Sequence, residues 1–291
     1  EILVSKNPFF MLWNIQRDIK ALAKQVPGAG LPKSLKAVMA SIPDAYKDVF
    51  KDISTSDVEE MYRQRSLIVG RYYSGRDIGA ETELDRLLQS FSETEPKYNA
   101  TVVAPFVKLW DWMDRPGKFI ERLTKIAGYK MMKEEGTLSP REIAHIVRTR
   151  AGSPDFKRAG SLVQFYNNLF LFSNPAKEGW RAAAEAFREN KSAYTWKTIK
   201  YDIIPKLLMI AAGAGALGPT IKRQMDRVSE YQKANYMISP IGETEDNKTV
   251  YFVVPHDFTG QLIAGLLWKA TSAGELGDFS QLADYTAGHI P

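Results

Sequence analysis

The sequence contains no cysteine, and this absence excludes several kinds of protein at once. Disulfide-stapled scaffolds, thiolate metal sites and enzymes with a cysteine nucleophile all need that residue. Histidine is also scarce, because His145, His256 and His289 are far apart and lack the spacing of zinc ligands. We therefore expect neither a metal site nor a bound cofactor.

The motifs of nucleotide hydrolysis and of serine catalysis are missing as well. The sequence G-K-[ST] of a phosphate-binding loop and the sequence G-x-S-x-G of a nucleophile elbow do not occur. His256 and Asp257 are neighbours in the chain, which directs their side chains apart. Acidic pairs such as Glu134 and Glu135 lie among charged residues, where nothing perturbs a pKa. We expect no catalytic residues and no small-molecule substrate.

Long hydrophobic runs are absent too. The uncharged run Leu207–Ile221 has 15 residues, whereas a membrane-spanning helix needs about 20. Within it, Gly213, Gly215 and Gly218 spell the dinucleotide pattern G-x-G-x-x-G, which requires strands on either side. Helical sequence flanks it instead. We predict a tight, buried corner between two helices, the second starting at Pro219; interfacial contact with a membrane is the alternative.

What the chain does contain is typical of a folded protein with a sizeable core. Of its 291 residues, 44% are hydrophobic and 25% are charged, which excludes a fully disordered chain. The net charge of +5 is unevenly distributed: residues 101–200 carry 18 basic and 10 acidic residues, and residues 251–291 carry 1 and 4. Such asymmetry indicates either a polyanion partner or a solvated helical surface.

Helical patterns dominate the first two hundred residues. The opening "NPFFMLWNIQRDIKALAK" predicts a helix capped by Asn7, started by Pro8 and ended before "VPGAG". Its first half is apolar nearly all round, which predicts burial. Asn14, Arg17 and Asp18 share one face, where they form either an internal polar network or a ligand site.

Local signals place the remaining elements. Pro116 and the glycine after it predict a break in the helical stretch 100–135, and Ser139 with Glu142 predicts a capping box. Two β-branched and aromatic runs predict one hairpin near 235–255, with a last helix from about Thr259 to Thr271. The fold class is mainly α, an irregular multi-helix bundle with one small C-terminal β-hairpin. We expect parts 1–100 and 101–291, or one continuous domain.

The best binding signal is a basic stripe on the helix after Pro116. Its members follow one another at spacings of 4, 3, 4 and 4, which places them opposite the apolar face: Lys118, Arg122, Lys125, Tyr129 and Lys133. Cations on one face neutralise phosphates, and a tyrosine stacks on a base. We predict contact with nucleic acid or a partner here; an ordinary amphipathic helix is the alternative.

Four stretches, in order, resemble the large polyvalent protein-associated domain of giant proteins in tailed bacteriophages and prophages. The first, "NPFFMLWNIQRD", is similar to that family's N-P-x-F-x-x-x-N-x-x-R-D opening. The others are "KFIERLTKIAGYKMMKEEG", "DFKRAGSLVQFYNNLFLFSNPAKEGW" and "VYFVVPHDFTGQLIAGLLW". The residues that match the opening motif look architectural: Asn7, Pro8, Asn14, Arg17 and Asp18.

The resemblance implies a non-catalytic module, with no catalytic residue to carry over. It implies a structural or assembly part of a phage internal core or DNA-ejection protein that is packaged inside the virion, delivered to the host cell, and present in the host cytoplasm during assembly. The expected partners are other virion proteins or further copies of the chain, with DNA or a membrane contacted during ejection.

Two alternatives to a purely structural role stay open. One is a membrane-active module of an ejection conduit, acting through Leu207–Ile221. The other is a nucleic-acid-contacting module beside an enzymatic domain elsewhere in the parent protein. Because the sequence starts at Glu1 rather than at methionine, we expect it to be a segment of a longer polypeptide.

Overall fold

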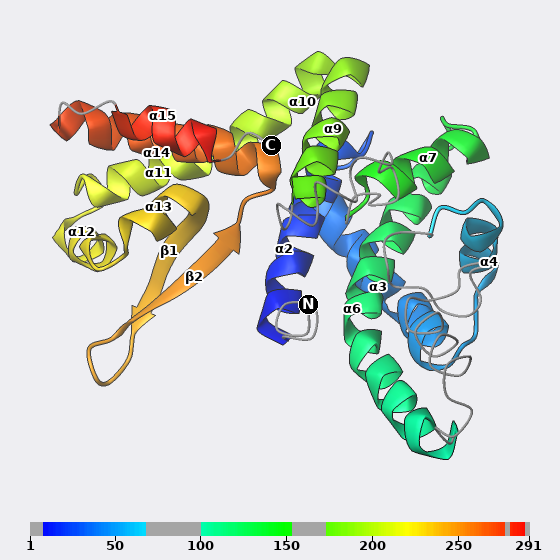
Figure 1. Cartoon of the computed structure of the whole chain (residues 1–291). Helices are drawn as coiled ribbons and strands as arrows, with labels where there is room; N and C mark the ends of the chain where they lie inside the picture. The colour runs from blue at the N-terminus through cyan, green and yellow to red at the C-terminus, as the bar shows by residue number, and fades with distance from the viewer. Residues whose placement is uncertain (1–7, 68–99, 153–172, 277–279, 289–291) are drawn as a thin grey trace. The chain divides into compact units, whose positions relative to one another are not determined.

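A computed structural model describes residues 8–67, 100–152, 173–276 and 280–288. Over these residues the chain is mainly α-helical with a single two-stranded antiparallel sheet, which confirms the expected fold class (Figure 1). The chain divides into two compact units, Glu1–Leu22 with Val26–Ser161 and Ala23–Gln25 with Leu162–Pro291. The division thus falls near residue 161, whereas we expected it near residue 100.

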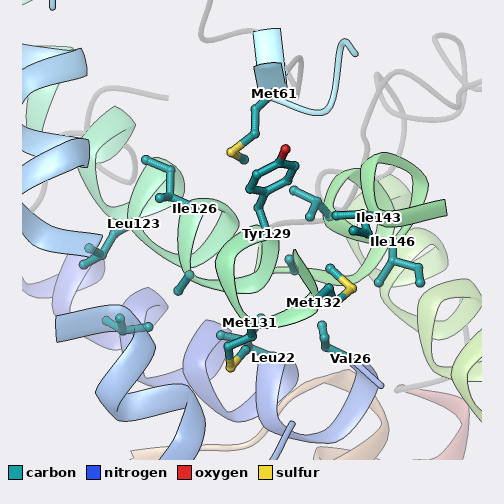
Figure 2. Packing of buried hydrophobic residues seen from close by; sticks show 14 of the residues in the cluster. Leu22, Val26, Met61, Leu123, Ile126, Tyr129, Met131, Met132, Ile143 and Ile146 are labelled. Carbon is teal, nitrogen blue, oxygen red and sulfur yellow. The ribbon is translucent and has the colours of Figure 1, made fainter. Parts of the chain in front are cut away.

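The first unit is a helical bundle built around one long helix. Its elements are α2 (Pro8–Gln25, up to Leu22), α3 (Leu31–Phe50), α4 (Ser56–Arg63), α6 (Ala100–Glu135) and α7 (Pro140–Arg150). Helix α6 packs against α3, α4 and α7, so it is covered on several sides. Its apolar side chains meet those of the surrounding helices in one core, shown in Figure 2.

Helix α3 presents small side chains to this bundle. Its buried positions include Ser34, Val38, Ser41 and Ala45, and small residues let two helix backbones approach closely. Larger apolar residues lie on its exposed side instead, for example Met39. The buried and exposed faces of α3 therefore differ more in side-chain size than in polarity.

The second unit contains the described elements from residue 173 onwards, together with Ala23–Gln25 at the end of α2. Its helices are α9 (Ser173–Glu189), α10 (Lys191–Thr198), a π-helical turn η1 (Ile199–Ile203), α11 (Ile204–Gly213), α12 (Pro219–Asp226), α13 (Glu230–Asn235), α14 (Phe258–Leu276) and α15 (Ser280–Ala287). Helix α10, η1 and α11 follow one another without a break, so they act as one long helix with a wide turn in its middle.

The hairpin consists of β1 (Tyr236–Glu243) and β2 (Thr249–Pro255), as the sequence predicts. Tyr236 pairs with Pro255 at its base, and the register is irregular between Pro240 and Gly242. The base of the hairpin joins the core of the second unit through Ile238, which packs with Met209, Trp268 and their neighbours. This core fixes α11, α13 and α14 around the hairpin.

Several local predictions are confirmed and several are wrong. Helix α2 ends at Gln25, and the capping box at Ser139 is present. The break expected at Pro116 is absent, because packing along α3 outweighs the one hydrogen bond that a proline removes. The first half of α2 is not buried all round, since Leu12 and Trp13 are exposed. Helix α14 is longer than expected and α15 was not predicted.

Candidate functional site

The predicted basic stripe on α6 does not form a surface. Arg122, Lys125 and Tyr129 are buried, and Tyr129 lies in the core beside Met61 (Figure 2). The spacing argument assumed that the side of α6 opposite its apolar face meets solvent. Other helices cover that side instead, so the placement of these three side chains at a surface was wrong.

Each buried cation of the stripe has protein partners. The Lys125 ammonium donates to the carbonyl oxygens of Val147 at 3.2 Å and Arg148 at 3.4 Å, near the end of α7. These carbonyls lie in the last turn of a helix, where no intrahelical donor is left for them and a cation is favoured. Lys125 therefore caps the C-terminal end of α7 and connects it to α6.

Arg122, which also lies in α6, makes its contacts with other parts of the first unit. Its guanidinium donates to the carbonyl oxygen of Leu67 at 2.6 Å and lies 3.6 Å from a carboxylate oxygen of Asp48. It also lies over the ring of Tyr62, 5.1 Å from the centroid. Arg122 thus connects α6 with α3 and with the chain around α4, a structural task.

Only the two ends of the stripe reach solvent. Lys118 is half-buried, and Lys133 is exposed with its ammonium 2.5 Å from the Asp57 carboxylate. The hydrogen bond to Asp57 raises the pKa of Lys133, and burial raises the pKa of Tyr129. Two lysines at the ends of the stripe, one of them already paired, make a much weaker phosphate-binding surface than the five-residue stripe.

The residues of the opening motif divide between described and undescribed parts of the chain. Asn7 lies outside the described residues, and Pro8 begins α2 as expected. Asn14 is half-buried, and Arg17 donates to the buried carboxylate of Asp18 at 3.0 Å. In this ion pair the Asp18 side chain is buried, whereas that of Arg17 is 26% exposed.

A second polar cluster, which the sequence did not reveal, lies buried in the second unit. We call it the Lys24 network, and its members are Lys24, Tyr194, Asp202, His256, Asp257 and Thr259. The Lys24 ammonium donates to Asp202 at 2.5 Å and to Asp257 at 2.9 Å. The side chains of Lys24, Asp202 and His256 are 0% exposed, and that of Asp257 is 3% exposed.

Electrostatics decide the charge state of Lys24. Burial alone lowers the pKa of a lysine, but the carboxylates of Asp257 and Asp202 outweigh this effect and raise the pKa of Lys24 above its ordinary value. The lysine is therefore an ammonium at every physiological pH. Burial also raises the pKa of Tyr194, whose hydroxyl lies 3.0 Å from Thr259 and therefore stays protonated.

Local structure holds each carboxylate in place. Asp257 precedes α14, and its carboxylate accepts the backbone N–H of Gly260 at 2.9 Å, the pattern of a helix N-cap. A side chain at Gly260 would collide with the carboxylates of Asp202 and Asp257, so only glycine fits there. Asp202 lies in η1 and also contacts Nδ1 of His256 at 3.1 Å.

The chemistry available to the Lys24 network is limited by its enclosure. A general acid or base must reach the proton that it transfers, and these side chains are shut off from solvent. Within the described residues, no group of three or more metal-binding side chains is arranged to hold an ion. The arrangement is that of a buried salt bridge which fixes one packing of α10, η1 and α14 around the end of α2.

Sequence reasoning missed the Lys24 network for an identifiable reason. It treated His256 and Asp257 as residues that point apart, yet both reach the network. The predicted start of a helix just after Asp257 was the available signal, because aspartate is a preferred N-cap. Nothing in the sequence connects Lys24 with Asp202, which lies 178 positions away.

A further buried lysine, Lys206, caps the end of a helix in the same way as Lys125. Its ammonium donates to the carbonyl oxygens of Lys233 at 2.6 Å, Ala234 at 3.3 Å and Tyr236 at 2.8 Å. These oxygens lie at the end of α13 and the start of β1, so Lys206 fixes the helix-to-strand transition against α11. Buried lysines are thus used in both units as internal caps.

The glycine stretch after α11 is a corner between helices, as predicted. Gly215 and Gly218 have φ values of +87° and +101°, which side chains rarely adopt, and α12 begins at Pro219. No strand flanks the glycines, so the dinucleotide interpretation lacks its structural context. The expected burial was wrong, however, because Leu207, Leu208 and Leu217 are exposed.

Of the helices in the described parts of the chain, none has the combined length and apolar character that a bilayer crossing needs. Leu207 and Leu208, both in α11, are large exposed apolar side chains. They form the most prominent unexplained apolar feature of the α10–α12 region.

Comparison of the chain with known protein families, with curated proteins and with solved structures found no match. Function is therefore inferred from the sequence segments and from the geometry of the two units.

Proposed function

We propose that the chain is a non-catalytic structural module of a phage-encoded protein that is packaged in the virion and delivered with the DNA. The observation that carries this proposal is that two of the segments resembling the phage family supply side chains which hold helices together. The segment Lys118–Gly136 supplies Arg122 and Lys125, which connect helices of the first unit. The segment Val250–Trp268 supplies Asp257 and Gly260 to the Lys24 network.

Residues that would mark a catalytic site elsewhere thus serve to hold helices together. A module of this kind acts through its surface, by contacting other virion proteins or further copies of itself. The proposed location is the virion interior, with the host cytoplasm during assembly. Any enzymatic activity belongs to other parts of the parent polypeptide.

Purified phage particles provide the test of this proposal. The chain is expected in DNA-filled particles, protected from added protease, and depleted from the empty particles left after ejection in vitro. Quantitative mass spectrometry would compare its peptides with those of the major capsid protein, which stays with the particle in both samples. Absence from intact particles, or equal amounts before and after ejection, would contradict the proposal.

DNA contact is a separate question that the same protein can answer. Because only Lys118 and Lys133 of the stripe reach solvent, replacing both by alanine should reduce the salt dependence of any DNA binding by no more than about two counterions. A larger reduction would show that the two substitutions also disturb phosphate contacts made by other residues.

A further inference from the structure

The exposed face of the continuous helix α10–η1–α11 and of the corner after it carries large apolar side chains. Trp196, Leu207 and Leu208 are 61%, 47% and 57% exposed, and Ile204 and Leu217 are exposed as well. Trp196, Lys200, Ile204 and Leu207–Leu208 follow one another at intervals of three or four residues, so they share one side of the helix. We call these side chains, with Leu217, the α11 surface.

The exposed charged side chains along the helix α10–η1–α11 are all basic. Between Glu189 and Asp226 the only acidic residue is Asp202, and its side chain is fully buried beside Lys24. Lys191 and Lys200 are exposed in the same stretch. Farther along, Lys222 and Arg223 are exposed too, although they lie near the carboxylates of Asp226 and Glu243.

We propose that the α11 surface binds the headgroup region of an anionic lipid membrane, with the helix lying flat on it. Helices of this type combine leucine and tryptophan on one side with lysine and arginine around it. The proposal concerns the surface itself, and it does not rest on the assignment of the chain to a phage protein.

The composition of the surface favours lipid over a protein partner. Lysine is depleted in protein–protein interfaces, whereas long lysine side chains extend readily to lipid headgroups. An exposed tryptophan at the end of the apolar row suits the boundary between headgroups and acyl chains, where its ring is amphipathic.

Vesicle flotation with the full chain tests the proposal. Vesicles of neutral phosphatidylcholine are compared with vesicles that contain one quarter phosphatidylglycerol. We expect binding to the anionic vesicles, weakened about fivefold for each lysine removed in Lys191→Gln and Lys200→Gln and reduced by high salt. No binding, or equal binding to both vesicles, would overturn the proposal.

A matched pair of variants distinguishes binding through the α11 surface from nonspecific hydrophobic binding by the rest of the chain. Leu207→Glu with Leu208→Glu should weaken vesicle binding at least tenfold, because both leucines are exposed and would lose their place among acyl chains. Met39→Glu on α3 changes an exposed apolar residue in the other unit and should leave binding unchanged. Circular dichroism checks that each variant stays folded. The proposal would be overturned if the double leucine variant and Met39→Glu lost vesicle binding equally, or if the double leucine variant lost none.

Two further measurements test whether Trp196 contacts the lipid and whether the α11 surface binds a second copy of the chain instead. Brominated lipids should quench the fluorescence of the bound chain, and Trp196→Phe should remove most of that quenching. Light scattering should show no change in oligomeric state caused by Leu207→Glu with Leu208→Glu. A dimer that this variant disrupts, without vesicle binding by the original chain, would show that the α11 surface binds a second copy instead.

Discussion

Replacement of Lys24 by methionine tests whether the Lys24 network holds the second unit together. Methionine has nearly the same length and volume, so the change removes the charge and leaves the packing largely intact. It leaves the carboxylates of Asp202 and Asp257 buried without their ammonium partner, which lies 2.5 and 2.9 Å away in the structure. Breaking a buried ion pair by removing one partner costs about 3–5 kcal/mol.

This loss is large compared with the stability of a typical domain, about 5–15 kcal/mol. Urea unfolding followed by far-UV circular dichroism measures it, and hydrogen exchange in peptides from β2 and α14 assigns the loss to the second unit. Lys33→Met is the matched control, because Lys33 is exposed and lies 3.6 Å from Glu135. An exposed pair contributes at most about 1 kcal/mol. A change below about 1 kcal/mol for Lys24→Met would refute the reasoning.

A second substitution shows whether unpaired charge is the cause. Asp257→Asn removes one carboxylate and keeps the cap of α14, since asparagine is also a good N-cap. The double variant Lys24→Met with Asp257→Asn buries one negative charge fewer than Lys24→Met alone. It should therefore be more stable than the single lysine variant. Equal or lower stability would mean that the lysine acts through packing.

The pH dependence of this effect has a definite sign. The carboxylates raise the pKa of Lys24 in the folded chain above the value of 10.5 for an exposed lysine. The stabilisation from Lys24 is therefore fully present below pH 10.5 and is lost as the pH rises further. The difference in unfolding free energy between the original chain and Lys24→Met should stay constant from pH 7 to about 10 and shrink above that.

Three further predictions follow from individual contacts. Lys125→Met should destabilise the first unit by about 1–3 kcal/mol in thermal unfolding, because two buried carbonyls lose a donor, whereas Lys118→Met should change stability by no more than about 0.5 kcal/mol. Gly260→Ala should cost about 1–3 kcal/mol through its clash with two carboxylates, whereas Gly213→Ala has ordinary space and should cost nothing measurable. Partial burial raises the pKa of the Glu230 carboxylate, but hydrogen bonds from Lys233 and Trp268 outweigh burial and lower this pKa. An NMR titration should therefore give a pKa below 4.5 for Glu230, and this pKa should rise in Lys233→Gln.

Elements defined by short-range signals were predictable from the sequence. The hairpin follows from two β-branched runs on either side of a polar loop, and the start of α7 follows from the Ser139–Glu142 capping box. The end of α2 follows from its breaker cluster. In each case the residues that decide the structure lie within a few positions of one another, so periodicity and capping rules contain the information.

The candidate site was not predictable because burial depends on distant partners. A 3.6-residue periodicity shows that two sides of a helix differ, but it does not show what covers the polar side. In α6 that side is covered as well, so Arg122 and Lys125 became structural cations. The same limit applies in reverse to Leu207 and Leu208 of α11, which were expected to be buried from the sequence and are exposed in the structure.

The π-helical turn explains how one helix carries both the Lys24 network and the α11 surface. Tyr194, Thr198, Asp202 and Lys206 are all buried and are spaced by four residues. In a regular α-helix with 3.6 residues per turn, each step of four drifts by about 40° around the axis, so this row would soon leave the buried side. A π turn is wider and reverses the drift where it occurs. Because η1 lies at the centre of the row, the polar residues stay inside, and the opposite side keeps Trp196, Ile204 and Leu208 together in solvent.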